Sequence, residues 1–320
     1  MDLIYMNKNR EDVNVMKNFT FDLAFGYDEN NFELKTDTGN HVCSDGYYLY
    51  LENTEYGGVI DSIRVKTATK ELVYKGRTWH GVLASKILAP DEGEDYLILT
   101  GEANQVLGDI VIRLGLGDLF AASTEDSGIT INAYQMPRYI NGYDGLKKVL
   151  ETVGCKLKIS FIKGFVTLSA EPLIDYSKDD EFDSSQLDFD IEKHYRPINH
   201  VICLGKGELK ERQVAHLYTD AEGHISHVQS LFDVEENTAI YENANAESVE
   251  ELEQGGVDLL KEAWKADALQ LNLDSAQTDD RGDVVGAREV TTSIFIARAI
   301  IKKIVKIERN VITISHKVGE

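Results

Sequence analysis

The sequence predicts a β-rich α+β fold, in which two small β-barrel domains lie on either side of an α+β segment. Short apolar runs, interrupted by Gly, Asn and Asp, occupy the first part of the chain and return in its last third. Helical spacing of apolar residues is clearest in the middle. We therefore expect a first β-barrel domain over 1–92, an α+β middle domain with an acidic linker over 93–195, and a second β-barrel domain with one helix over 196–320.

The first domain shows the pattern of a half-buried antiparallel sheet. Apolar and polar residues alternate from Val59 to Val65, as in a strand with one face in the core. Thr67–Lys70 is a plausible hairpin connection, and Leu72–Lys75 is the next strand. Three earlier short apolar runs complete the predicted sheet: Phe19–Leu23, Asn31–Leu34 and Tyr47–Leu51.

Two helices are predicted in the middle domain. Apolar residues recur at helical spacing through Glu102–Leu114, and Gly115 can end that helix. The second helix is Tyr143–Val153, followed by Gly154, whose missing side chain permits a left-handed conformation. Both apolar stripes indicate core packing rather than a ligand site.

A hairpin and an acidic stretch follow. Lys156–Phe161 and Phe165–Ala170 alternate apolar and polar residues across the turn signal Lys163-Gly164. The second predicted helix would therefore pack on a two-stranded hairpin. Residues 177–193 are rich in Asp and Glu, without the order of Gly and carboxylates that a calcium loop needs, and are expected to form a surface linker.

The last third is again rich in predicted strands. Residues 246–266 are expected to form its one helix, although Gly255-Gly256 interrupts the pattern. The predicted strands are Val201–Leu204, a hairpin of Arg212–Tyr218 and Ile225–Val228, Leu269–Leu273, and a long pair of Phe295–Glu308 and Val311–Val318.

Length and composition place the chain among water-soluble globular proteins of two or three domains. It has 320 residues with 42% hydrophobic and 28% charged residues. We expect no membrane segment, because no stretch approaches the roughly 20 apolar residues that a membrane helix needs. Residues 1–17 lack a signal-peptide core, so we expect the protein in the cytoplasm or on a particle assembled there.

The cysteines and the charge exclude several classes of function. Cys43, Cys155 and Cys203 lie far apart in apolar surroundings, which predicts buried free thiols rather than disulfides or a zinc site. The net charge is −22, from 55 acidic and 33 basic residues. This balance opposes tight binding of nucleic acids, which requires clustered Lys and Arg.

One group of residues has the composition of a metal site. His224 and His227 lie in a predicted turn and strand beside Asp220 and Glu222. Side chains three residues apart on a strand point to opposite faces, so we expect an exposed hairpin rather than a metal site.

No catalytic residue is predicted. None of the eight histidines stands in an HExxH arrangement, and no GxSxG elbow is present. Asp179-Asp180 and Asp279-Asp280 lie in polar, turn-like stretches and are interpreted as solvated loops. Gly205-Lys206-Gly207 is too short for a phosphate loop. Arg77, Trp79, Arg138 and Tyr139 could stack on sugars, although a core position is the more common use of a Trp. No cofactor-binding or metal-binding residue is predicted either.

A series of short motifs spans nearly the whole chain. The motifs are NFEL (31–34), GYYLYL (46–51), YGGVID (56–61), YKGRTWHGVLASKIL (74–88), RYINGYDGLKKVL (138–150), 161–172 with Asp175-Tyr176-Ser177, RPINHVICLGKG (196–207), GDVV (282–285) and the closing strand 314–319. Their order is more specific than any one of them. The ordered series resembles the tail-hub, or baseplate-hub, proteins of siphophages and Gram-positive prophages.

The resemblance implies a structural role without enzymatic activity. Hubs of this kind are trimers whose subunits carry two barrels related to the tail-tube fold, so that six similar units form a ring. Such a ring joins the tail tube to a central spike or tip. The implied partners are two further copies of the chain, a tail-tube or distal tail protein, a tape measure protein and a spike or tip protein. The implied location is the baseplate or tip of a virion tail, assembled in the host cytoplasm. An acidic lumen would let DNA pass without binding it.

Two other functions remain open at this point. The chain could be a peripheral tail protein that binds a receptor or carbohydrate, with an exposed aromatic groove. It could also be a cell-wall hydrolase, which would need a convergent acid/base or nucleophile arrangement.

Overall fold

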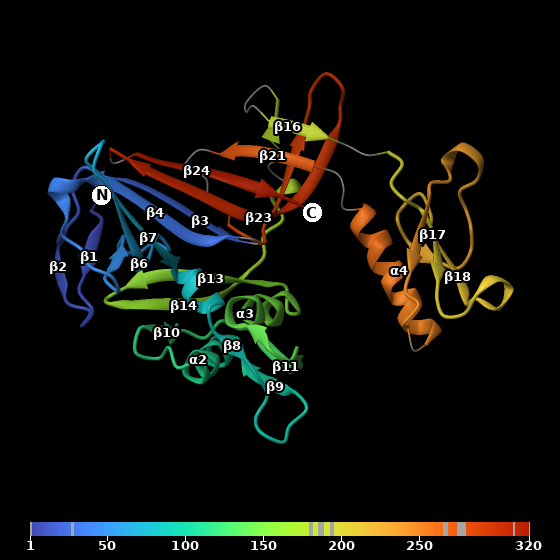
Figure 1. Ribbon diagram of the computed structural model, residues 1–320, viewed down its shortest axis with the longest axis horizontal. Coiled ribbons are helices and arrows are strands. Elements are labelled where there is room, and N and C mark those ends of the chain that lie inside the picture. Colours follow the sequence, from blue (N-terminus) through green and yellow to red (C-terminus); the bar gives the residue numbers. More distant parts are fainter. Residues whose placement is uncertain are drawn as a thin grey trace.

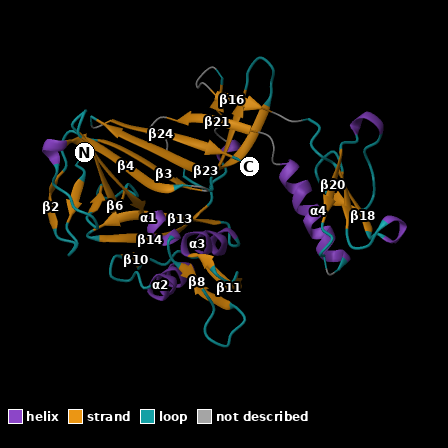
Figure 2. Cartoon of the chain, viewed as in Figure 1, coloured by secondary structure: helices purple, strands orange, loops and turns teal. Residues whose placement is uncertain are grey.

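The computed structural model describes residues 2–26, 29–178, 182–184, 189–192, 195–246, 248–264, 268–273, 280–309 and 311–319. These residues form a β-rich fold with few helices, which confirms the predicted fold class (Figure 2). No helix within these ranges combines the length and the apolar character required to cross a membrane.

The largest sheet has 13 strands and contains both ends of the chain (Figure 1). Its main path runs β16-β21-β24-β23-β3-β4-β7-β6-β5-β1-β2, and β22 lies beside β23 with β15 beside β22. The strands are β1 (Ile4–Met6), β2 (Asp12–Val15), β3 (Thr20–Gly26), β4 (Asn30–Asp37), β5 (Tyr48–Tyr50), β6 (Gly57–Lys66), β7 (Glu71–Thr78), β15 (Phe182–Asp183), β16 (Phe189–Glu192), β21 (Ala268–Leu273), β22 (Val284–Arg288), β23 (Phe295–Glu308) and β24 (Val311–Val318).

The long strand β23 connects the two ends of the chain. Its first part pairs with β22, and its second part pairs with β24 on one side and with β3 on the other. The antiparallel register with β3 runs from Lys302 opposite Gly26 to Glu308 opposite Thr20. Consequently Val305 and Ile307 are buried in the same apolar cluster as the phenylalanines of β3.

This pairing bears on the predicted domains. Backbone hydrogen bonds join the strands of the predicted first domain directly to the C-terminal strands of the predicted third. Between them, residues 195–264 have a sheet and an apolar cluster of their own. The division at residues 92 and 195 and the closure of two barrels stay predictions.

The middle of the chain packs three helices against small sheets. Helices α1 (Trp79–Ala84), α2 (Ala103–Arg113) and α3 (Gly142–Glu151) share one apolar cluster with the hairpin of β13 (Cys155–Ile162) and β14 (Phe165–Pro172). The expected helix-on-hairpin unit is confirmed, and β10 (Phe120–Ala122) adds a parallel strand to it that was not predicted. Two further short pairs were also missed: β8 (Ile87–Leu88) with β12 (Ile140–Asn141), and β9 (Leu97–Glu102) with β11 (Thr130–Met136).

The segment of residues 195–264, called the lobe below, is a four-stranded sheet with one helix. The strand order is β19-β18-β17-β20, and the members are β17 (His200–Leu204), β18 (Val214–Thr219), β19 (Ile225–Ser226), β20 (Thr238–Glu242) and α4 (Val249–Trp264). Figure 1 shows α4 beside β17 and β18, on one face of the sheet.

The two glycines of α4 allow this close packing. A Cβ atom at Gly256 would lie 2.4 Å from the Sγ atom of Cys203, and one at Gly255 would lie 2.2 Å from the ring of Tyr241. The interruption of the helical pattern is therefore a packing requirement of the helix rather than a break in it.

Candidate functional site

Charged side chains, most of them buried, gather where the N-terminal strands, the middle of the chain and the C-terminal strands meet. The group, called the junction network below, contains residues from the β5–β6 loop, α1, β13, the turn before β22, β23 and β24. Its members are Glu55, His80, Lys156, Lys158, Asp280, Arg281, Asp283, Lys303 and His316.

Glu55 is a central acceptor of this network. Its carboxylate lies 2.8 Å from the Nζ atom of Lys303, 3.4 Å from Nε2 of His80 and 3.7 Å from Nη2 of Arg281. Burial alone would raise the pKa of Glu55, but the charges of Lys303 and Arg281 hold it well below its usual value. Glu55 is therefore ionised. Its negative charge balances Lys303 of β23 and Arg281 of the turn before β22.

Asp283 connects β13 and the segment that follows β14 to the turn before β22. Its carboxylate accepts from Nζ of Lys156 at 2.5 Å, from the backbone N–H of Ile174 at 2.9 Å and from the backbone N–H of Asp280 at 2.9 Å. The side chain is fully buried. The motif GDVV thus contains a structural carboxylate, and two of its three partners, Lys156 and Ile174, lie more than one hundred positions away in the sequence.

The prediction for Asp280 was wrong. We expected Asp279-Asp280 to form a solvated loop, but Asp280 is only 4% exposed and pairs with Lys158 at 3.2 Å. Lys303 lies 3.8 Å away. Burial and the nearby charge of Glu55 raise the pKa of Asp280. The residues next to Asp280 in the sequence are polar and gave no sign of its burial, which results from the packing of distant segments around it. Asp279 and Asp179-Asp180 lie outside the described residues.

The guanidinium of Arg281 contacts two aromatic rings. Its guanidinium carbon is 5.1 Å from the ring centre of Phe25 and 5.3 Å from that of Tyr143, which is the geometry of cation–π contact. Burial lowers the pKa of Arg281 to about 10, although Glu55 opposes the shift. The side chain therefore connects β3 to α3 while remaining charged.

The two histidines of the junction network, His80 and His316, are held neutral. Arg281 donates through Nη2 to Nε2 of His80 at 2.6 Å, so that nitrogen acts as the acceptor and the proton lies on Nδ1. Burial and the charge of Arg281 lower the pKa of His80 to about 4. Burial and the charge of Lys303 likewise lower the pKa of His316 to about 4.

A cavity of about 300 Å³ adjoins the network between α3, β13 and β23. Apolar side chains, including Leu157, Leu173 and Ile300, form much of its wall, and Arg281 and Lys156 contribute to it from the network. The network can hold three segments of the chain in one arrangement, since each segment supplies charges that the others neutralise.

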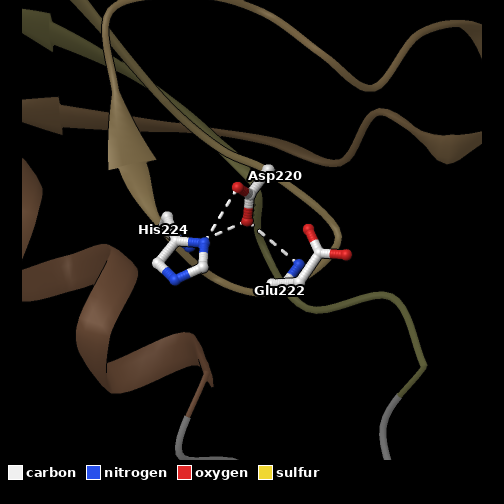
Figure 3. A group of neighbouring side chains, drawn as sticks. All are labelled: Asp220, Glu222 and His224. Carbon is white, nitrogen blue, oxygen red and sulfur yellow. Dashed lines mark hydrogen bonds and ion pairs between the residues drawn. The ribbon is translucent and has the colours of Figure 1, made fainter.

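The predicted metal candidates are only partly brought together. Asp220, Glu222 and His224 place one ligand atom each within 4.8 Å of one another (Figure 3). Asp220 accepts from the backbone N–H groups of Glu222 and His224 at 3.0 and 2.9 Å and from Nδ1 of His224 at 3.0 Å, so tight-turn hydrogen bonds account for the arrangement. His227 lies apart, near the carbonyl of His216. The absence of a metal site stays a prediction.

The remaining candidates fall into buried and exposed groups. The three cysteines are free and buried as predicted, and burial raises the pKa of the Cys43 thiol to about 12. Trp79 is fully buried against Phe161, so it is a core residue. The guanidinium of Arg77 donates two hydrogen bonds to Asp61 across β6 and β7, at 2.8 and 2.9 Å.

Arg138 and Tyr139 are the exposed pair among the residues considered for stacking. The guanidinium of Arg138 covers the ring of Tyr139, and that ring is 67% exposed. In the lobe, Gly205-Lys206-Gly207 follows β17, and Gly207 adopts a φ of 104°, as a turn requires.

Comparison with known structures assigns the fold. The 43 kDa tail protein of prophage MuSo2 from Shewanella oneidensis aligns with a TM-score of 0.56 at 10% identity, over 99% of this chain and 97% of the other. A tail protein from Neisseria meningitidis MC58 aligns with a TM-score of 0.53 at 11% identity, over 100% and 96%. A chain of the p2 virion baseplate in its activated conformation gives 0.51 at 10% identity, over 99% and 98%. Neither a protein-family model nor a curated protein sequence matches. The chain thus has the fold of phage and prophage tail proteins over its whole length.

Proposed function

We propose that this protein is a structural hub of a phage tail or tail-like particle, three copies of which form a ring between the tail tube and the central spike or tip. The observation that carries the proposal is the single sheet formed by the N-terminal and C-terminal strands, in a fold shared along its whole length with tail and baseplate proteins. Each copy would supply two related barrel-like units to a ring of six.

The strand path supports a closed assembly. Its main path ends at β2 and at β16, each of which has one neighbour within the described strands. An unpaired strand edge exposes backbone donors and acceptors that favour pairing with another chain. In a ring, the two ends of one copy would face the ends of the next, which satisfies both edges at once.

The proposed partners follow from this position. A tail-tube or distal tail protein and the tape measure protein would meet one side of the ring, and a spike or tip protein would meet the other. The protein would reside at the baseplate or tip of the virion tail after assembly in the host cytoplasm. In a phage, DNA would pass through the lumen without specific binding.

The charge of the lumen is a separate part of the proposal. Ion pairs on the solvent face of the large sheet balance much of its charge, among them Lys35–Glu33, Lys75–Glu33 and Arg77–Asp61. If this face lined the channel, the channel would be close to neutral. An acidic lumen therefore requires that other surfaces supply the excess of carboxylates.

The proposal assigns the protein no enzymatic activity. The junction network gathers titratable side chains with shifted pKa values. Within it, carboxylates and cations neutralise one another, as expected of a structural element. Peptidoglycan zymography tests this assignment, and clear lysis by the purified chain would reject it. A glycan-binding assay with host cell-wall sugars tests the peripheral receptor-binding alternative. The burial of Trp79 removes the side chain that this alternative most needed.

The oligomeric mass tests the ring directly. The chain has a mass of 35.8 kDa, so a trimer would have about three times that value. We expect mass photometry of the purified full chain to show the trimer, with a proportion that rises with concentration. A strictly monomeric chain that is also absent from purified particles would contradict the proposed function.

A further inference from the structure

The lobe has one covered and one open sheet face. On the covered face, Val201, Cys203 and Leu217 pack against Leu252 and Leu260 of α4. Because side chains alternate along a strand, the residues between them point to the opposite face. That open face carries large apolar side chains, which a free globular domain normally buries.

Cross-strand pairing defines the open face as three rows. One row is Val214, Leu204 and Glu242, the next is His216, Ile202 and Ile240, and the third is Tyr218, His200 and Thr238. Ile240 is 64% exposed and Val214 is 51% exposed. The centre of the face is therefore an aliphatic stripe that runs across three strands.

An aromatic stack borders this stripe. The rings of His200 and His216 are 5.2 Å apart, and that of Tyr218 is 4.4 Å from His200. Nε2 of His200 lies 2.9 Å from Nδ1 of His216, while Glu236 holds the other ring nitrogen of His200 at 2.7 Å. These contacts hold the rings nearly parallel to one another. The face is therefore preformed, and its side chains need little further ordering when a partner binds.

The lobe as a whole is acidic. Glu242 belongs to the first row, where its side chain is 61% exposed and pairs with Arg212, and Glu236 borders the third row, where it contacts His200. Residues 195–264 contain 5 Lys and Arg against 14 Asp and Glu. Subtracting these from 33 and 55 leaves 28 basic and 41 acidic residues elsewhere, so a second copy offers no basic counterpart overall.

We infer that the open face docks a different protein, whose surface has an aliphatic or aromatic centre and a rim of Lys or Arg. The aliphatic stripe supplies the buried centre of such an interface, and the excess of carboxylates on the lobe favours a basic partner over another acidic copy. Within the proposed function, on which this inference rests, the partner is a second tail or baseplate protein.

Zero-length carbodiimide cross-linking of purified particles tests the inference, because it joins a carboxylate to a lysine in direct contact. We expect mass spectrometry to find cross-links from Glu236 or Glu242 to lysines of another particle protein. Cross-links to a second copy, to another part of the same chain, or to no protein at all would overturn the docking inference. Absence of the chain from the particle would overturn the proposed function as well.

A substitution with a matched control separates docking from folding. Ile240→Glu places a charge in the stripe, and Ile112→Glu places one on α2, where Ile112 is 72% exposed. We expect Ile240→Glu to reduce incorporation of the full chain into particles at least tenfold, while Ile112→Glu leaves incorporation within twofold. Both variants should retain the melting temperature of the parent. Normal incorporation of a folded Ile240→Glu variant would reject the docking face.

Discussion

The junction network and the open face of the lobe differ in which kind of side chain they bury. The first buries Glu55, Asp283 and Lys303, which would be hydrated elsewhere, whereas the second leaves Ile240 and Val214 in contact with water. Buried charges are tolerated because partners within the same chain neutralise them. Exposed apolar side chains gain their stabilisation only from another molecule. The buried charges of the junction therefore find counter-charges within one chain, whereas the exposed apolar side chains of the lobe have no such partner among the described residues.

The largest expected effect comes from removing one charge of the junction. Glu55→Gln leaves Lys303 and Arg281 without their shared counter-charge. We expect a loss of about 3–5 kcal/mol in the free energy of unfolding, since one partner of a buried ion pair cannot be removed without leaving the other uncompensated. Urea denaturation measures it. The matched control is Glu242→Gln, whose exposed pair with Arg212 should change stability by less than about 1 kcal/mol.

The second prediction tests whether the lobe is stabilised by its own core. Leu260 is fully buried in the lobe cluster, so Leu260→Ala should cost roughly 2–5 kcal/mol. We expect hydrogen exchange to accelerate for amides of β17 and β18 and to remain unchanged for those of β3 and β23. Equal acceleration in both regions would show that the lobe and the large sheet unfold together, which would break the comparison.

The third prediction concerns acid. His80 and His316 have pKa values lowered to about 4, against 6.5 for a free histidine, so the unfolded chain binds more protons between these values. The stability from keeping both rings neutral is complete above pH 6.5 and is lost as pH falls toward 4. The raised pKa of Asp280 acts in the opposite sense and offsets part of the loss. We expect a net loss of about 3 kcal/mol from pH 7 to pH 5, seen in urea midpoints.

The smallest expected effect comes from a substitution of His316, which tests the source of the acid-induced loss of stability. Neither ring nitrogen of His316 has a hydrogen-bond partner among the described residues, and the side chain is buried. His316→Leu removes these unpaired groups and keeps a similar volume, so stability at pH 7 should change by less than about 1 kcal/mol. The acid-induced loss should fall by roughly half, because one of the two titrating rings is gone. An unchanged loss would assign the acid sensitivity to other groups.

The sequence predicted local structure well where the pattern is regular. Phe295–Glu308 and Val311–Val318 were predicted with the bounds that the structure shows, because both runs are rich in Ile and Val and lie on either side of a turn. The helix predicted over Glu102–Leu114 was confirmed as α2, because its apolar residues recur at helical spacing. In both cases the signal lies within a few neighbouring residues.

The pairing of strands that lie far apart in the sequence could not be predicted from local patterns. Nothing near Lys302 or Lys303 indicates that β23 pairs with β3, almost three hundred residues earlier in the chain. Lys156 alternates with apolar residues as an outward-facing strand residue would, yet it is 8% exposed because Asp283 neutralises it. A carboxylate in a polar turn and a lysine on a strand have the same local sequence whether they are solvated or paired. The tertiary fold alone decides between these states.

Electron cryomicroscopy of the tail tip in purified particles tests the central claim most directly. The account predicts three copies of this chain around the tail axis, with strands of neighbouring copies side by side and the large sheet of each copy in the wall of a continuous ring. A tip in which this chain lies off the axis, as a peripheral appendage without contact between its copies, would contradict it.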